Sequence, residues 1–356
     1  MAQSAEAAIR EAFAEQAQAC AQRGSPLTSR LCEALARVLD RSTRTGQRVL
    51  EWPGRPDARG DSVPLRLVGG LQALVRRGSL PSLAALYPPH PLPDLQVLEK
   101  TLAEVLPTAD DRLLPWLDLP PQTNEPMRSA PLMAGLLVIA QETNRLPLAL
   151  YEVGASAGLL LVLDRYRHCL GTTAAGAPDA PVLIEPQWQG SSPPNAHVRI
   201  ARRQGSDLEP LNVTSQEDRE RLLAYIWADQ ADRLARVEAA LEIAAGEPPR
   251  LDAAEAAAWT ERTMSTEPEA GVARVLFHAV AMQYASEETR ERIAAHAARV
   301  GAQANTGAPF AWLRFEADPE FDEQASLRLT LWPSGQEEVL AIGDTHGERV
   351  RWLRQR

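Results

Sequence analysis

Lysine, cysteine and long apolar runs are all scarce in this sequence of 356 residues, and each shortage excludes a class of protein. Lys100 is the only lysine among 37 basic residues, and no glycine-rich turn precedes it. A Walker-type phosphate loop needs a lysine directly after its glycine-rich turn, so that kind of nucleotide site is excluded. The three cysteines, Cys20, Cys32 and Cys169, show neither CxxC nor His-pair spacing. This pattern is typical of free thiols in a reducing compartment, and it predicts no structural zinc.

The N-terminal segment and the net charge restrict the expected location and partners of the protein. The first residues, MAQSAEAAIREAFAEQ, lack the basic start and apolar centre of a secretion signal, and no stretch offers about 18 uninterrupted apolar residues. A formal net charge of −10 disfavours a protein whose affinity depends on neutralising many phosphates. We therefore expect a cytoplasmic protein with a small-molecule partner, no membrane contact and no nucleic-acid partner.

The spacing of the apolar residues changes near residue 146. Before this point, apolar residues such as Ile9 and Phe13 recur at helical intervals, and proline clusters such as YPPHPLP separate the periodic stretches. After it, short continuous apolar runs alternate with helical patterns. We expect two domains: a helical N-terminal region over residues 1–145 that covers a cleft, and an α/β domain over residues 146–356.

The second part of the chain predicts a mostly parallel sheet. LALYEV is a short apolar run bounded by proline and glycine, which is typical of a strand buried on both faces. The runs HVRIARRQGSD, RVLFHAVAMQY and FAWLRFEA follow, separated by predicted helices, one of which is long and carries Leu223, Leu234 and Leu241 on one side. Strands separated by helices need crossover connections and therefore a parallel sheet. The last runs, SLRLTLWPSG and QEEVLAIGD, predict an antiparallel C-terminal hairpin.

The loop after LALYEV carries the main functional signal. In an open parallel sheet, ligands bind beyond the carboxyl ends of the strands, where glycines let the backbone come close and a helix starting near Gly158 would offer free N–H groups. Glu152, Gly154, Ser156 and Gly158 resemble the first motif of S-adenosylmethionine-dependent methyltransferases, an acid followed by three glycines at alternate positions, with Ser156 in place of the middle glycine. The resemblance implies a methyltransferase-like, Rossmann-like α/β fold and S-adenosylmethionine as the cofactor at these residues.

A second acid supports the same interpretation. Methyltransferases of this kind carry an acid at the end of the next strand for the ribose hydroxyls, and Asp207 in GSDLEP takes that place if residues 169–197 form an insertion. Asp252 is then a candidate for a contact with adenine. His278 and Tyr284, in RVLFHAVAMQY, lie at the end of the predicted fourth strand, where this fold commonly places groups that face the methyl acceptor.

The segment QTNEPMRSA adds two candidate catalytic residues. Glu125 and Arg128 lie three residues apart on the opening turn of the last helix before the sheet. If this turn lies near the loop after LALYEV, Arg128 can hold a carboxylate in a fork and Glu125 can accept a proton or an amine. A helix cap with an exposed ion pair is the structural alternative.

Two other interpretations stay open. GASAG also fits the G-x-S-x-G elbow of serine hydrolases, with Ser156 as nucleophile and Asp344 and His346 as acid and base. The same small residues would equally allow a helix to pack closely on the sheet, with Asp252 as a helix cap and His278 in the core. That arrangement leaves a non-catalytic nucleoside-binding or interaction domain.

Four segments of the chain occur in a characteristic order: QTNEPMRSA, YEVGASAGLLLVLDRY, GSDLEPLNVTSQEDRERLLAYIWADQADRL and DTHGERVRWL. Together they resemble the bacterial family filed as domain of unknown function 2332, over most of the chain. The resemblance implies that the helical part and the sheet belong to one unit, and it brings no reaction with it. The expected function is S-adenosylmethionine-dependent methyl transfer to a small acceptor, which needs little beyond positioning.

Overall fold

The computed structural model describes residues 2–355, and these divide into two compact units. The helical unit comprises residues 2–123 and Gln216–Ala235, and the sheet unit comprises Asn124–Ser215 and residues 236–355. The chain therefore begins in the helical unit, enters the sheet unit, returns to the helical unit and finishes in the sheet unit.

The helical unit packs amphipathic helices around an apolar core. Its elements are α1 (Ala2–Gln22), α2 (Pro26–Val38), α3 (Arg44–Leu50), α4 (Val63–Arg76), α5 (Pro81–Ala84), α6 (Leu95–Leu113), the 3-10 helix η1 (Leu114–Leu117), α8 (Gln216–Ala224) and the start of α9 (Ala231–Gly246). Buried side chains such as Phe13, Leu31 and Leu67 form the core. Within the described part of the chain, no helix has both the length and the hydropathy that crossing a membrane requires.

The single long helix predicted for the returning segment is wrong, because α8 ends at Ala224 and α9 begins only at Ala231. Between them, Asp229 accepts hydrogen bonds from the Ser25 hydroxyl and, at 2.8 Å, from the N–H of Leu27. The carboxylate thereby caps the N-terminus of α2, where free N–H groups and the helix dipole favour an acid. This tertiary contact outweighs the helical periodicity of the segment.

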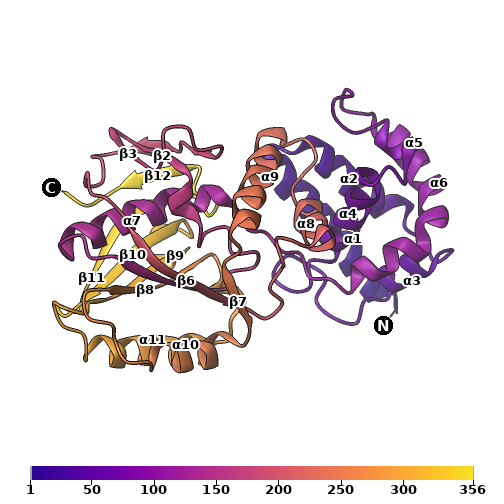
Figure 1. Cartoon of the computed structure of the whole chain (residues 1–356). Helices are drawn as coiled ribbons and strands as arrows, with labels where there is room; N and C mark the ends of the chain where they lie inside the picture. The colour runs from indigo at the N-terminus through magenta and orange to yellow at the C-terminus, as the bar shows by residue number, and fades with distance from the viewer. Residues whose placement is uncertain (1, 356) are drawn as a thin grey trace. The chain divides into compact units, whose positions relative to one another are not determined.

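The sheet unit is built on a nine-stranded sheet with the order β5-β12-β11-β10-β9-β8-β1-β6-β7 (Figure 1). The bounds are β1 (Leu148–Val153), β5 (Gln187–Gln189), β6 (Ile200–Asp207), β7 (Arg250–Ala253), β8 (Ala273–Ala279), β9 (Phe310–Ala317), β10 (Ala325–Trp332), β11 (Gln336–Gly343) and β12 (Arg349–Trp352). Neighbours from β7 to β9 are parallel, and neighbours from β9 to β12 are antiparallel. The predicted α/β fold, with a mostly parallel sheet and antiparallel C-terminal strands, is confirmed.

The order of the five parallel strands defines one special point in the sheet. Numbered along the chain, β1, β6, β7, β8 and β9 have the spatial order 3-2-1-4-5. The direction of winding therefore reverses between β1 and β8. In open α/β sheets the crevice at such a reversal, beyond the carboxyl ends of the strands, is where ligands bind.

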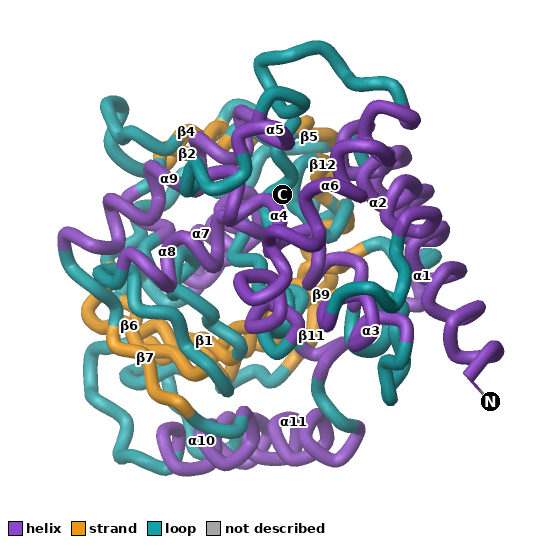
Figure 2. The backbone as a smooth tube through the Cα atoms, turned by 90° about the vertical axis from the view of Figure 1, so that its right-hand side faces the viewer, coloured by secondary structure: helices purple, strands orange, loops and turns teal. Residues whose placement is uncertain are grey.

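Helices cover both faces of this sheet (Figures 1 and 2). One face carries α7 (Ser129–Glu142), and the other carries α10 (Ala256–Met264) and α11 (Glu287–Gly301). Along β1, Tyr151 packs with Trp259 of α10, so the next residue, Glu152, points to the α7 face. Gly135 of α7 lies so close to that face that an added Cβ would be 2.7 Å from Leu313 of β9.

Turns over residues 154–162 replace the helix that the sequence predicts near Gly158. Gly158 has a φ of +73°, which a right-handed helix does not allow. Two side chains also take backbone groups that a helix would use. Asn124 Oδ1 accepts from the N–H of Leu159 at 2.8 Å, and the Tyr166 hydroxyl donates to the Leu159 carbonyl at 2.7 Å.

The chain then builds a small three-stranded sheet with the order β3-β2-β4. It follows the 3-10 helix η3 (Leu163–Arg165) and consists of β2 (Arg167–Leu170), β3 (Thr173–Ala175) and β4 (Leu183–Ile184). β2 and β3 form an antiparallel hairpin. Much of this small sheet falls in the segment where the sequence predicts an insertion, and β5 then joins the main sheet beside β12.

Candidate functional site

The turn after β1 explains the spacing of the sequence motif. Gly154, Ser156 and Gly158 all have positive φ values, of 73°, 51° and 73°. Glycine adopts this left-handed region without a steric penalty, whereas any other L-residue is strained there by roughly 1–2 kcal/mol. The backbone shape therefore requires small residues at alternate positions, and Ser156 holds the same shape under strain.

The N–H groups of this turn are engaged within the protein. Gly154 and Ala155 both donate to the carbonyl of Ser206 at 2.9 Å, and the N–H of Ser156 donates to Asp207 Oδ2 at 2.8 Å. A phosphate cradle needs several N–H groups that point at the ligand. Because these three point at protein oxygens, the turn fits a ligand that makes no phosphate contact here.

Glu152 is the buried acid at the end of β1. It is 1% exposed, and its Oε2 has no hydrogen-bond partner in the part of the chain described. Asp207 ends the neighbouring strand β6 on the same face, because Glu152 lies opposite Gly205. Burial and the Asp207 carboxylate raise the pKa of Glu152 well above its usual value, and Arg128 opposes them. The protein thus disfavours the charged form of this carboxyl group.

Glu125 and Arg128 lie in the segment before α7, where the 3-10 helix η2 (Pro126–Arg128) begins. Glu125 is 1% exposed, accepts from the N–H of Met127 at 3.1 Å and lies 3.4 Å from Arg236 Nε of α9. Arg128 Nε donates to the carbonyl of Thr345, beyond the end of β11, at 3.0 Å. These contacts fix the segment beside the strand ends.

Tyr166 also belongs to this region, although the sequence does not single it out. Its ring is buried, and its hydroxyl donates to the carbonyl of Leu159 in the turn. Burial and the nearby Glu152 carboxyl raise the pKa of Tyr166. The signal available in the sequence is its position at the end of the apolar run that follows Gly158.

His278 and Glu316 form a hydrogen-bonded pair on the opposite face of the sheet. His278 of β8 is out of phase with Glu152 and therefore points to the side of α10 and α11. Its Nδ1 lies 2.6 Å from Glu316 Oε1, and its buried Nε2 has no partner among the described residues. Glu316 also accepts from the N–H groups of Ala281 and Met282, at 3.0 and 3.3 Å. This carboxylate therefore fixes both the imidazole and the turn after β8.

Asp252 lies on that same side and binds protein donors. Gln204 Nε2 and Trp259 Nε1 each donate to its Oδ2 at 2.8 Å. Burial raises the pKa of Asp252, but the hydrogen bonds from Trp259 and Gln204 outweigh burial, so the net shift is downward. Tyr284, which follows β8, is 78% exposed.

The residues that the sequence proposes for one site therefore fall into two groups. The α7 face carries Glu152 and Asp207, together with the turn formed by Gly154, Ser156 and Gly158 and the Glu125 and Arg128 segment. The face of α10 and α11 carries Asp252 and His278. The candidate site lies on the α7 face, and the sequence did not indicate Tyr166, Arg236 or Glu316.

Asp344, the acid of the hydrolase interpretation, accepts hydrogen bonds from backbone N–H groups of its own loop. Its Oδ1 accepts from the N–H of His346 at 2.9 Å, and its Oδ2 accepts from the N–H of Arg349 at 2.6 Å. An acid that orients a catalytic histidine binds the imidazole Nδ1–H. These two hydrogen bonds to Asp344 stabilise the turn between β11 and β12.

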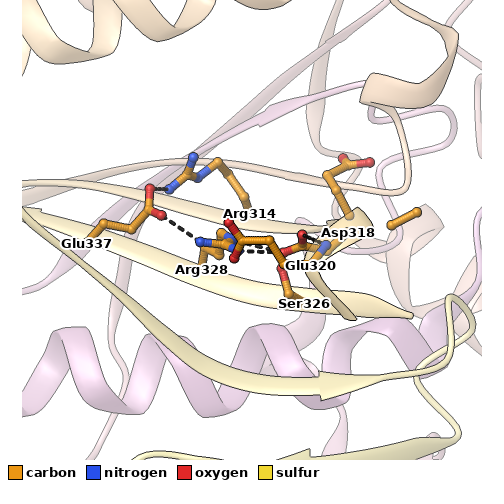
Figure 3. Close-up of a pocket in the computed structure, with 8 residues that line it drawn as sticks. Arg314, Asp318, Glu320, Ser326, Arg328 and Glu337 are labelled. Carbon is orange, nitrogen blue, oxygen red and sulfur yellow. Dashed lines mark hydrogen bonds and ion pairs between the residues drawn. The ribbon is translucent and has the colours of Figure 1, made fainter. Parts of the chain in front are cut away.

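A polar pocket of about 360 Å³ lies on β9, β10 and β11 (Figure 3). Within it, Arg328 bonds Asp318 at 2.8 Å, Glu337 at 2.9 Å and also Glu320, and Arg314 bonds Glu337. These opposite charges satisfy one another, so the pocket is an ion-pair network that joins antiparallel strands. The described residues contain no group of three or more His, Cys, Asp or Glu side chains placed to hold a metal ion.

Comparison with known proteins identifies the family of the chain. No curated protein and no solved structure matches the chain, and nothing in the comparisons supports the resemblance to a methyltransferase motif. A family profile, however, matches residues 10–352, which include both units almost completely. The chain therefore belongs to the family described as "Uncharacterized protein conserved in bacteria (DUF2332)".

Proposed function

We propose that the sheet unit binds S-adenosylmethionine, or a related nucleoside, at the carboxyl end of β1 and transfers a methyl group to a small acceptor. The observation that carries this proposal is Glu152, a buried carboxyl with one oxygen lacking a hydrogen bond, at the point where the strand order reverses. Ligands of open α/β sheets bind at this point. A ligand ammonium or hydroxyl group would supply the missing hydrogen bond and favour the charged carboxylate.

The turn favours such a ligand over a dinucleotide. Its N–H groups bind Ser206 and Asp207, and no helix N-terminus follows it to receive a pyrophosphate. S-Adenosylmethionine carries an ammonium group and ribose hydroxyls and has no phosphate. Glu152 and Asp207 offer carboxylate oxygens to such groups from neighbouring strands on one face.

Methyl transfer needs few protein groups besides those that bind the cofactor. When bound, S-adenosylmethionine supplies an activated methyl group. Methyl transfer depends on in-line positioning of the acceptor, and an acceptor that holds a proton also needs a base. Glu125 and Arg128, buried next to the same strand ends, are the residues that we assign to orienting the acceptor and accepting its proton.

Isothermal titration of the full chain with S-adenosylmethionine and with its demethylated product tests the proposal. We expect saturable binding that Glu152→Gln weakens at least about tenfold, the effect of losing one charge-assisted contact. Glu291→Gln, an exposed change on α11, is the matched control and should bind like the wild type. Failure of the wild type to bind at millimolar ligand rejects the proposal. Binding with no methyl transfer to any small acceptor tested would favour the non-catalytic nucleoside-binding alternative.

One observation favours a second candidate, a serine hydrolase. Ser156 has a φ of +51° at the centre of G-x-S-x-G, and nucleophilic serines of hydrolases sit on similarly strained turns after a strand. A fluorophosphonate probe should then label Ser156, and Ser156→Ala should abolish labelling while Ser334→Ala, an exposed serine on another loop, leaves it unchanged. Absence of labelling in the wild type rejects this candidate.

A further inference from the structure

A larger pocket of the sheet unit lies beside the small sheet, and its lining includes no residue of the turn over residues 154–162. Its volume is about 660 Å³, within the usual range for sites of small organic ligands. Its walls come from Met133 of α7, Arg145 after that helix, Asp164 of η3, residues 174–177 of β3 and the turn after it, and the segment 195–198. Met133 and Ala174 are among the apolar lining residues, and the polar lining consists of Arg145, Asp164, Asn195 and His197. We refer to this cavity as the Arg145 pocket.

The Arg145 pocket is locally basic in a protein of net charge −10. The guanidinium of Arg145 is exposed and has no hydrogen-bond or ion-pair partner among the described residues. The acid in the lining, Asp164, is neutralised by Arg203, whose two Nη atoms bond its two carboxylate oxygens at 2.9 and 3.2 Å. The free positive charge of Arg145 is therefore not balanced within the pocket.

Two further arginines reach residues of the lining. Arg167 Nη1 donates to the carbonyl of Gly176 at 3.0 Å, and Arg199 Nη2 donates to the carbonyl of Arg145 at 3.5 Å. In the described part of the chain, neither guanidinium has a carboxylate partner. His197 and Asn195 are exposed residues of the same lining and add donors to it. Arg145 lines the cavity itself, and Arg167 and Arg199 bond its lining residues from outside that lining. This positive charge suits a doubly charged anion better than a single carboxylate.

The backbone is strained at Arg145. Asn144 and Arg145, two and three residues after α7 ends at Glu142, have φ values of +52° and +62°. Asparagine is common in the left-handed region at helix C-termini, but a second consecutive residue there, and a bulky one, is costly. Strain of this kind is often retained where a side chain must be held in one place.

We propose that the Arg145 pocket binds the phosphate group of a small phosphorylated metabolite, with Arg145 as the main ligand and Asn195 and His197 as additional donors. The apolar and small residues of the walls, such as Met133 and Ala174, receive the uncharged body of the ligand. This site is separate from the one proposed at Glu152, and neither proposal depends on the other.

Isothermal titration of the full chain with ribose 5-phosphate, ribose, inorganic phosphate and succinate, at one ionic strength, tests the inference. We expect heat of binding with ribose 5-phosphate and with phosphate but not with ribose or succinate. Arg145→Gln should weaken phosphate binding at least about tenfold, because a charge-assisted contact is lost. Arg351→Gln changes an exposed arginine of β12 outside the pocket and should bind like the wild type.

Three outcomes would overturn the inference. Equal titrations with ribose and ribose 5-phosphate would show that the phosphate is not recognised. Binding of succinate in place of phosphate would assign the pocket to another class of anion. Unchanged affinity in both Arg145→Gln and His197→Gln, with each variant shown to be folded by circular dichroism, would place any phosphate binding elsewhere on the protein.

Discussion

Buried ionisable groups on the two faces of the main sheet include carboxyl groups that differ in how completely they are hydrogen-bonded. On the α7 side, Glu152 has an oxygen without a hydrogen bond and a raised pKa, and His168, bonded to Ser129 of α7, has a pKa lowered by burial to about 3. On the α10 and α11 side, the carboxylates of Asp252 and Glu316 accept several hydrogen bonds from the protein. Satisfied acids hold a fold together, whereas an unsatisfied one is a candidate for function. The predictions that follow test this contrast.

The largest change in stability is expected at Gly154, where the turn after β1 lies against the turn after β8. An added Cβ at Gly154 would lie 2.6 Å from the Cβ of Ala281, and Gly154 has a φ of +73°. Gly154→Ala should therefore lower the free energy of unfolding by about 2–4 kcal/mol, from left-handed strain and overpacking. Urea unfolding measures it. Gly246→Ala, which has no neighbour within 4 Å, should change stability by less than about 1 kcal/mol, and equal effects would contradict the packing argument.

The second largest loss of stability is expected from removing Glu316, an acid whose hydrogen bonds are satisfied within the protein. Glu316→Ala leaves the imidazole of His278 and the N–H groups of Ala281 and Met282 without their acceptor. We expect a loss of about 2–3 kcal/mol in the free energy of unfolding, because buried donors without partners are costly. Glu291→Ala on the exposed side of α11 should cost less than about 0.5 kcal/mol. A Glu316→Ala protein as stable as that control would mean that this acid is not structural.

His168 should give the α7 side a distinctive sensitivity to acid. Its pKa is lowered from 6.5 to about 3 in the folded protein, because burial disfavours the imidazolium. The unfolded chain binds the proton first, so the stabilising contribution is complete above pH 6.5 and declines as the pH falls towards 3. Between pH 6.5 and 5 the wild type should lose about 2 kcal/mol relative to His168→Gln, at about 1.4 kcal/mol per pH unit. Parallel stability curves for the two proteins would refute the assignment.

Glu152 should make the free energy of unfolding depend on pH in the opposite direction to His168, and by a smaller amount. Its pKa is raised above 4.5 by burial and by Asp207, so the folded state binds the proton more tightly than the unfolded chain. The group then favours folding below about pH 4.5, and this benefit declines as the pH rises to the folded-state pKa. Glu152→Gln should therefore be more stable than the wild type at neutral pH, by on the order of 1 kcal/mol, while it loses ligand. Thermal unfolding from pH 4 to 8 measures the difference in stability between the two proteins. A Glu152→Gln protein less stable than the wild type at neutral pH would mean that Glu152 stabilises the fold.

The sequence predicts the strands of the sheet better than the loops. LALYEV forms β1, and the first six residues of RVLFHAVAMQY lie in β8, because burial on both faces needs mainly apolar runs. The sequence predicts the start of a helix where the structure has the turn after β1, because Asn124 and Tyr166, which prevent a helix, act through tertiary contacts. Periodicity does not contain that information.

The candidate site was predictable in its types of residue but not in its geometry. An acid followed by small residues at alternate positions marked the turn, and the structure gives the reason in the three positive φ values. Glu152 and His278 point to opposite faces of the sheet because Glu152 pairs with Phe277 of β8. The pairing register of two strands decides this, and it cannot be read from a single sequence. Arg236 reaches Glu125 from α9, which lies far along the chain, and no local pattern connects them.

The cap that Asp229 places on α2 has a consequence for synthesis of the chain on the ribosome. The helical unit includes Gln216–Ala235, so its N-terminal helices must wait for more than half of the protein to be made before their last partners arrive. In that interval the surface of α4 that later receives α8, including Gln72, which bonds the carbonyl of Leu223, stays uncovered. Nascent chains that stop near Thr123 should therefore be good clients for chaperones that bind exposed apolar helices.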